Sequence, residues 1–164
     1  MRHYRLVAVS NYRGWDLRGL VEPTQFAVKN DDGHIVYAIA ANSAWSDRRL
    51  TIRDSEGKEV ARLHKKASRN YKLLRHNRAA ATVAYKDPVL RWRDRYSIKT
   101  RDGDDMEAVQ TAVGSGVYQI DRQGRTLARF SHRDLEVDES VDPLMIVAAI
   151  VVAALPRSGM GGGD

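Results

Sequence analysis

Residues 142–155 read Asp-Pro-Leu-Met-Ile-Val-Ala-Ala-Ile-Val-Val-Ala-Ala-Leu, the most apolar stretch of the chain. Asp142 can cap a helix, and Pro143 suits the first helical position because the N–H that it lacks would have no partner there. Pro156 is expected to end the helix. Twelve apolar residues extend about 18 Å in a helix, well short of the roughly 30 Å hydrocarbon core of a bilayer. We therefore predict a buried core helix at about 142–155 and no transmembrane span.

A helix that is apolar on every side must be enclosed on every side. The enclosure is predicted from a unit that recurs four times in the chain. Each unit has two alternating strands around a polar turn with a glycine, and apolar residues stand three and six positions after that glycine. The four units are residues 26–39, 50–63, 96–109 and 118–130, with Gly33, Gly57, Gly103 and Gly124 in their turns.

These units are expected to be β-hairpins. Glycine suits the turn because it adopts positive φ without a Cβ clash, and a preceding Asp, Asn or Glu can bond the local backbone. Weaker strand patterns bring the total to about 11 or 12 strands. They occur at residues 4–9, at 71–74 with 79–85 across a turn at 75–78, and at 15–21.

The predicted helix decides how these strands are arranged. A sandwich fills its interior with its own side chains, whereas a closed barrel of about a dozen strands is wide enough to need a plug. We therefore predict a mainly β protein, a single closed antiparallel β-barrel of about 12 strands around a central hydrophobic C-terminal α-helix. The barrel domain is expected at residues 1–157, and the Gly-rich residues 158–164 are expected to form a flexible tail.

Length and composition indicate the number of domains and the location of this protein. The chain has 164 residues, enough for one domain with a substantial core, and no cysteine, which excludes disulfides and thiolate chemistry. Residues 1–10 lack the apolar core of a signal peptide. We expect a cytoplasmic protein.

Positive charge is concentrated in one third of the chain. The net charge is +6, but residues 62–101 carry 13 Lys or Arg against two acidic residues, a local excess of 11. Such a block indicates an anionic partner. If Arg91, Arg93 and Arg95 lie on a strand, they project from a single face, as alternate residues do. The candidate anion-binding residues are Lys65, Lys66, Arg69, Lys72, Arg91, Arg93 and Arg95.

Three interpretations of the basic block remain open. Arginine grips phosphate with paired donors, so one is an anionic membrane surface or a phosphoinositide-like headgroup, with the protein peripheral to the membrane. Another is a nucleic-acid-associated regulator that uses the same residues. The third is a solvated barrel face on a scaffold or small-ligand carrier, which would have a cavity beside the helix.

The repeated hairpins and the terminal helix resemble a known family. The form I-x-D-x-x-G-x-x-V-A-x-L, clearest at residues 52–63 and 120–130 with the helix at 141–155, resembles the LURP-one-related group of the tubby-like superfamily. The resemblance implies a 12-stranded antiparallel barrel around a central helix. It implies little about activity, because the group is largely uncharacterised. Tubby proteins bind phosphoinositides, but no matching lipid-site motif is present to carry over.

No motif points to catalysis or to a metal. The five histidines are scattered, and no nucleophile elbow or P-loop occurs. Residues 102–107 are acidic but lack the ligand spacing of a calcium loop, so a turn is the better interpretation. The acidic residues 134–139 precede the helix, and their later members are expected to cap it. We expect a non-enzymatic binding module without a cofactor.

Overall fold

The computed structural model describes residues 1–8, 24–43, 46–67, 69–86, 93–112 and 116–153. Twelve strands form one closed antiparallel barrel, in which each strand pairs with its neighbours in sequence and β1 pairs with both β2 and β12. The strands are β1 (Arg2–Ala8), β2 (Thr24–Asn30), β3 (Ile35–Ser43), β4 (Ser46–Asp54), β5 (Glu59–Ala67), β6 (Asn70–Arg75), β7 (Arg78–Lys86), β8 (Arg95–Thr100), β9 (Met106–Gln110), β10 (Tyr118–Arg122), β11 (Arg125–Ser131) and β12 (Asp134–Val137). The predicted barrel is confirmed.

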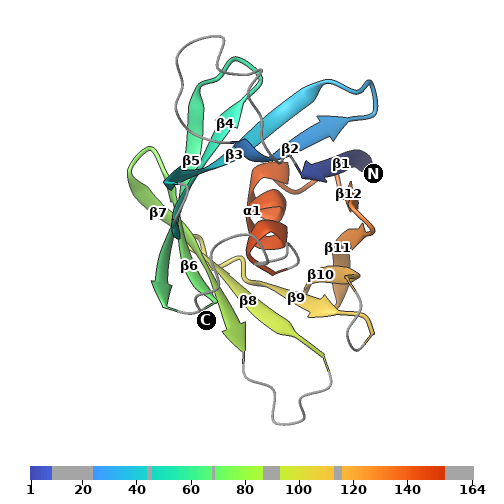
Figure 1. The fold of residues 1–164 in the computed structure, drawn as a ribbon. Helices are drawn as coiled ribbons and strands as arrows, with labels where there is room; N and C mark the ends of the chain where they lie inside the picture. Colours follow the sequence, from blue (N-terminus) through green and yellow to red (C-terminus); the bar gives the residue numbers. More distant parts are fainter. Residues whose placement is uncertain (9–23, 44–45, 68, 87–92, 113–115, 154–164) are drawn as a thin grey trace.

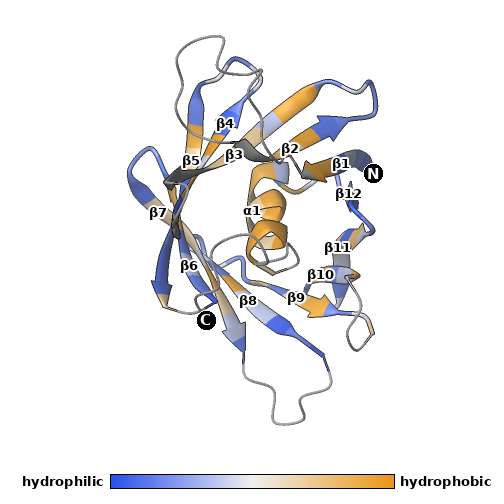
Figure 2. Ribbon diagram, in the orientation of Figure 1, coloured by the Kyte–Doolittle hydropathy of each residue, from blue (hydrophilic) through white to orange (hydrophobic). Residues whose placement is uncertain are grey.

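The predicted helix is α1 (Pro143–Ala153), and it lies inside the ring of strands (Figure 1). It is apolar along its length, like the strand residues that face it (Figure 2). Residues Ile146–Ile150 are fully buried, and the helix contacts β6 and β7. Five consecutive buried residues cover every side of a helix with 3.6 residues per turn. The helix therefore fills the interior that a 12-stranded barrel leaves open.

Asp142 caps the helix as predicted. Its Oδ1 accepts a hydrogen bond of 3.0 Å from the backbone N–H of Leu144, the second residue of the helix. The same carboxylate pairs with Arg75 of β6 at 2.5 Å. The start of the helix is thus attached to the barrel wall. None of the helical segments among the described residues combines the length and the apolarity that crossing a membrane requires.

All four predicted hairpins are present, as β2–β3, β4–β5, β8–β9 and β10–β11. Their turn glycines all have positive φ, between 78° and 80°. In the second hairpin, Asp54 Oδ1 accepts hydrogen bonds of 2.9 Å from the N–H groups of Glu56 and Lys58, and Asn30 makes the equivalent bonds in the first. The residue three positions before the glycine therefore shapes the turn, as the repeat indicates.

The weaker strand predictions are also confirmed where they can be compared. Residues 4–9 correspond to β1, and residues 71–74 and 79–85 correspond to β6 and β7, which join through His76 and Asn77 with φ of 51° and 62°. Positive φ at both positions is the signature of a tight type I′ hairpin turn. The possible strand at residues 15–21, the end of the helix at 154–155 and the tail at 158–164 lie outside the described residues.

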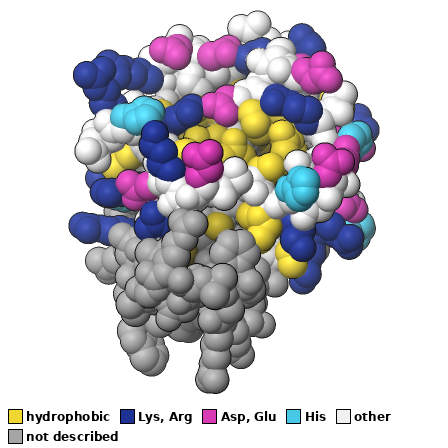
Figure 3. Space-filling model, turned by 90° about the horizontal axis from the view of Figure 1, so that it is seen from above, with side chains coloured by type: hydrophobic (Ala, Val, Ile, Leu, Met, Phe, Trp, Pro, Cys, Tyr) yellow, Lys and Arg dark blue, Asp and Glu magenta, His cyan; other side chains and the backbone are white. Residues whose placement is uncertain are grey.

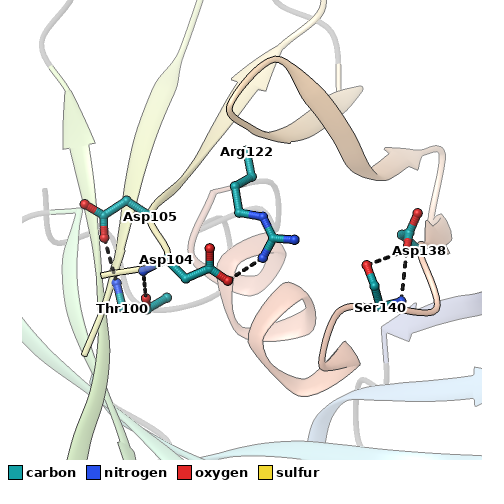
Figure 4. A network of polar contacts seen from close by, with 6 residues as sticks. All are labelled: Thr100, Asp104, Asp105, Arg122, Asp138 and Ser140. Carbon is teal, nitrogen blue, oxygen red and sulfur yellow. Dashed lines mark hydrogen bonds and ion pairs between the residues drawn. The ribbon is translucent and has the colours of Figure 1, made fainter. Parts of the chain in front are cut away.

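One acidic segment was assigned the wrong role. Residues 134–137 form β12, in which Leu135 and Val137 are fully buried and the acids between them face outward. Asp138, expected to cap the helix, instead accepts hydrogen bonds from the hydroxyl and the N–H of Ser140 (Figure 4). It also accepts one from Arg125. These hydrogen bonds, those from Ser140 above all, lower the pKa of Asp138 to about 2. Asp138 therefore stabilises the link between β12 and α1.

Candidate functional site

The predicted basic residues lie on β5, β6 and the start of β8. Lys65 and Lys66 are near the end of β5, Arg69 lies between β5 and β6, and Lys72 is on β6. Arg95 is the first residue of β8, whereas Arg93 precedes that strand, so the two are not alternate residues of one strand. Arg91 lies outside the described residues.

A row of five outward residues, three of them Lys or Arg, crosses the outer side of the barrel wall. Its residues are successive cross-strand partners on β4 to β8, namely Arg49, His64, Lys72, Thr82 and Lys99. The sequence neighbours of these five on the same strands include Leu50, Leu63, Leu73, Val83 and Ile98, which are all buried. Since side chains alternate along a strand, the row points outward. Four steps of about 4.8 Å between strands make it roughly 19 Å long.

His64 lies within this positive field. The pKa of His64 is lowered from 6.5 by burial first, and then by the charges of Arg49, Lys66, Arg62 and Lys72. These four cations come from β4, β5 and β6. We call the outward residues Arg49, Arg62, His64, Lys66 and Lys72 the basic face.

The charge of the basic face is only partly balanced. Arg62 forms an ion pair of 2.6 Å with Glu59 on its own strand. Lys66 and Lys72 have no ion-pair partner within the described part of the chain. Two of the seven predicted residues therefore belong to this face.

The other described candidates do not join it. Lys65 pairs with the buried Tyr71, so it lies on the opposite side of β5 from Lys66. Arg95 is 3.6 Å from Glu107, a carboxylate that it shares with Lys86. Arg93 is exposed ahead of β8.

Arg69 belongs to a polar cluster near the opposite end of the barrel from Asp142. Its guanidinium lies 4.6 Å from the centre of the Tyr85 ring and 4.0 Å from the carboxylate of Asp94. Tyr96 packs edge-on against both Tyr85 and Tyr118, and burial raises the pKa of the Tyr118 hydroxyl. Arg69 is thus held by aromatic and acidic neighbours.

The sequence did not single out Arg49, Arg62 or Lys99. Arg49 lies outside the basic block in the chain, and only the register between β4 and β5 places it beside His64. The alternation of Arg49 with Leu50 and of Lys99 with Ile98 does predict that both side chains point outward. Which outward residues become neighbours depends on strand register, and one hairpin pattern leaves that undetermined.

A cavity of about 860 Å³ lies at the end of the barrel where the helix begins. Two ion pairs lie among its lining residues, Arg75 with Asp142 and Arg122 with Asp104. Figure 4 shows the second of them. Hydrogen bonds with Thr100 stabilise the acidic turn at 102–107. The Thr100 N–H donates to Asp105, and the Thr100 hydroxyl accepts from the Asp104 N–H. No cluster of His, Cys, Asp or Glu that could hold a metal occurs among the described residues.

Positive charge is not uniform over the surface. On the side drawn in Figure 3, Lys and Arg side chains are interspersed with Asp and Glu around an apolar area.

Of three comparisons with known proteins, one gives a match. Neither the curated proteins nor the solved structures include a match to this chain. The family model described as LURP-one-related matches residues 19–154, which extend from before β2 to the end of α1. With its 12-stranded barrel and enclosed helix, the chain belongs to the LURP-one-related family.

Proposed function

We propose that this protein is a non-enzymatic binding module whose basic face engages anionic phospholipid headgroups at a membrane surface, to which the protein is peripheral. The observation that supports this best is the set of cations around His64. Arg49, Lys66 and Lys72 project from three adjacent strands around His64, whose pKa is lowered first by burial and then by the charges of its cationic neighbours.

The shape of the basic face favours a surface over a small molecule as its partner. Its residues stand on the outer side of a closed barrel, with the inward residues of the same strands packed around α1. Lysine presents a compact charge on a flexible stem, which suits many loosely placed phosphates. Cations near an anionic leaflet contribute about 1 kcal/mol each. Several together give a weak and reversible attachment.

Flotation with lipid vesicles tests the proposal. The wild-type protein is expected to float with vesicles that contain phosphatidylserine and to remain behind with pure phosphatidylcholine. The triple variant Arg49→Gln/Lys66→Gln/Lys72→Gln loses three cations at about 1 kcal/mol each, so its affinity is expected to fall by a factor on the order of 100.

The matched control removes three cations elsewhere on the barrel. Lys29→Gln/Lys58→Gln/Arg129→Gln makes the same change in net charge on β2, on the β4–β5 turn and on β11. It is expected to float nearly as well as the wild type. Equal recovery with neutral and anionic vesicles, or equal losses in both triple variants, would refute a membrane role for the basic face.

The same variants separate the membrane from nucleic acid. Binding to a DNA or RNA duplex would fall steeply with salt and would involve the same cations. The proposal expects no gel shift at physiological salt, together with flotation at that salt. A gel shift without flotation would favour the nucleic-acid interpretation.

A further inference from the structure

A groove lined by small side chains and cations lies on the outside of β7 and β8. Strand β7 begins with Arg78, which Ala79, Ala80 and Ala81 follow. The short alanine side chains leave this shallow groove of about 620 Å³ beside the end of β8. The groove shares Arg78, Ala79, Ala80, Thr100 and Arg101 with the 860 Å³ cavity at the barrel mouth. The two spaces are therefore neighbours, with Arg78 and Arg101 on their shared border.

The groove is lined by three cations and by no acidic residue. Arg78 and Lys99 stand on β7 and β8, and Arg101 follows β8. A backbone hydrogen bond of 3.0 Å from Arg101 N–H to Ala80 O holds the end of β8 against the start of β7. Within the described residues none of the three forms an ion pair, in contrast to Arg75 and Arg122, which line the cavity. Their charge is available to a ligand.

Two threonines, Thr82 and Thr100, also line the groove. Thr82 is the cross-strand partner of Lys99, and Thr100 lies between Lys99 and Arg101. The Thr100 oxygen accepts a hydrogen bond of 2.8 Å from Asp104 N–H, so its own proton remains able to donate. Three cations and two hydroxyls around one groove match the several oxygens of a phosphate, which guanidinium groups bind with paired donors.

The barrel mouth next to the groove has an apolar floor. Met106 and Val141 are 7% and 8% exposed, and Met145 on the first turn of α1 is half-buried. The Leu144 N–H at the helix start already donates to Asp142. An anion here would therefore be held by the arginines, while an attached hydrocarbon part would lie on the methionines.

We propose that this groove binds a phosphate monoester that carries a short apolar group. The phosphate lies between Arg78, Lys99 and Arg101, and the apolar group extends over Met106 and Met145. Each of the two spaces, about 860 and 620 Å³, falls in the range of small-molecule sites. Thr82 and Lys99 continue the row that starts on the basic face, so the groove adjoins that face. Arg78 and Arg101 belong to neither the basic face nor its flotation variants, so the two sites are tested with different variants.

Isothermal titration calorimetry with hexyl phosphate tests the assignment. The wild-type protein is expected to bind hexyl phosphate at least tenfold more tightly than inorganic phosphate or hexanol, because each of these supplies only half of the contacts. The variant Arg78→Gln/Arg101→Gln is expected to lose at least tenfold in affinity for hexyl phosphate. Both side chains are exposed at the surface or its rim, so thermal unfolding should stay close to that of the wild type.

The control variant Lys58→Gln/Arg129→Gln has the same net charge and should bind hexyl phosphate like the wild type. Equal binding of inorganic phosphate and hexyl phosphate would overturn the apolar contact. Equal affinity of the two double variants would overturn the site.

A second experiment measures binding of the wild type and the variants to vesicles that contain phosphatidic acid, at the same phosphate concentration as in the calorimetry. Loss of vesicle binding in Arg78→Gln/Arg101→Gln, with no binding of hexyl phosphate to the wild type, would assign the groove to the membrane surface and refute a small-ligand site. Failure of flotation in the basic-face variants leaves the calorimetric result unchanged, so the two proposals are tested separately.

Discussion

The pKa of His64 reports on the positive charge of the basic face, to which this residue belongs. Its imidazole is surrounded by Arg49, Lys66 and Lys72, and its pKa is lowered from 6.5 by burial and by these charges. An NMR titration of the wild type, assigned with a His64→Gln variant, is expected to show a midpoint for His64 below 6.5. In Lys66→Gln/Lys72→Gln the midpoint should rise but not reach 6.5, because burial is the larger cause.

The sign of the pH effect on stability follows from the same shift. The unfolded chain binds the His64 proton more readily than the folded chain, so this residue's contribution is present above pH 6.5 and is lost as the pH falls through the lower folded pKa. Lys58→Gln/Arg129→Gln should leave the His64 midpoint unchanged. A wild-type midpoint at or above 6.5 would show that the cations do not gather around this histidine.

Prediction from the sequence succeeded for Asp142, which caps the helix through a local pattern. Lys66 and Lys72 lie on β5 and β6 as outward residues of the basic face, and their role as anion-binding residues stays a prediction. The prediction did not distinguish Arg69, whose partners Tyr85 and Asp94 are 16 and 25 residues away in the chain. A charge block shows how much charge is present but not which cations have acidic partners, because those partners come from other strands.

At the scale of elements, the hairpins could be predicted because each has its own turn signal. The glycine and the residue three positions before it form one local unit, and Asp54 shows its hydrogen bonds. Strand β12 was missed because it has only four residues and half of them are acidic. Its two inward residues, Leu135 and Val137, become recognisable as a strand only once β1 and β11 lie beside them.

The helix is the element on which the barrel interior depends. Ile146 and Ile150 are fully buried, and Ile150→Asp would place a carboxylate among apolar side chains with no partner. An uncompensated buried charge costs about 3–5 kcal/mol, a large part of the roughly 5–15 kcal/mol that stabilises a typical domain. Thermal unfolding followed by circular dichroism is expected to show a strongly lowered or absent cooperative transition.

Ser55→Asp provides the control for that substitution. It adds the same charge on the exposed β4–β5 turn, where the unfolding temperature should change little. If Ile150→Asp unfolded at the wild-type temperature, the helix would have to lie outside the barrel.

For the whole molecule, the decisive feature is closure. Strand β1 pairs with β12 on one side and with β2 on the other, so the first strand joins the last. Arg2 adds a hydrogen bond of 2.6 Å to the Val141 carbonyl, just before the helix. The matched family region begins at residue 19, after β1, although the barrel closes only through this strand. Sequence alternation predicts the strand, whereas its pairing depends on the complete ring.

Deletion of residues 1–8 tests the contribution of closure. The deletion removes the buried Leu6 and leaves β2 and β12 with unpaired edges, which are ready templates for pairing with another chain. We expect a lowered unfolding temperature and oligomers that grow with protein concentration in size-exclusion chromatography with light scattering. The point variant Leu6→Ala keeps the edges paired and is expected to lose about 2–5 kcal/mol of stability without oligomerising. If the deletion variant behaved in both measurements like Leu6→Ala, the loss of one buried side chain would account for its behaviour, and β1 would not be needed to protect the edges of the barrel.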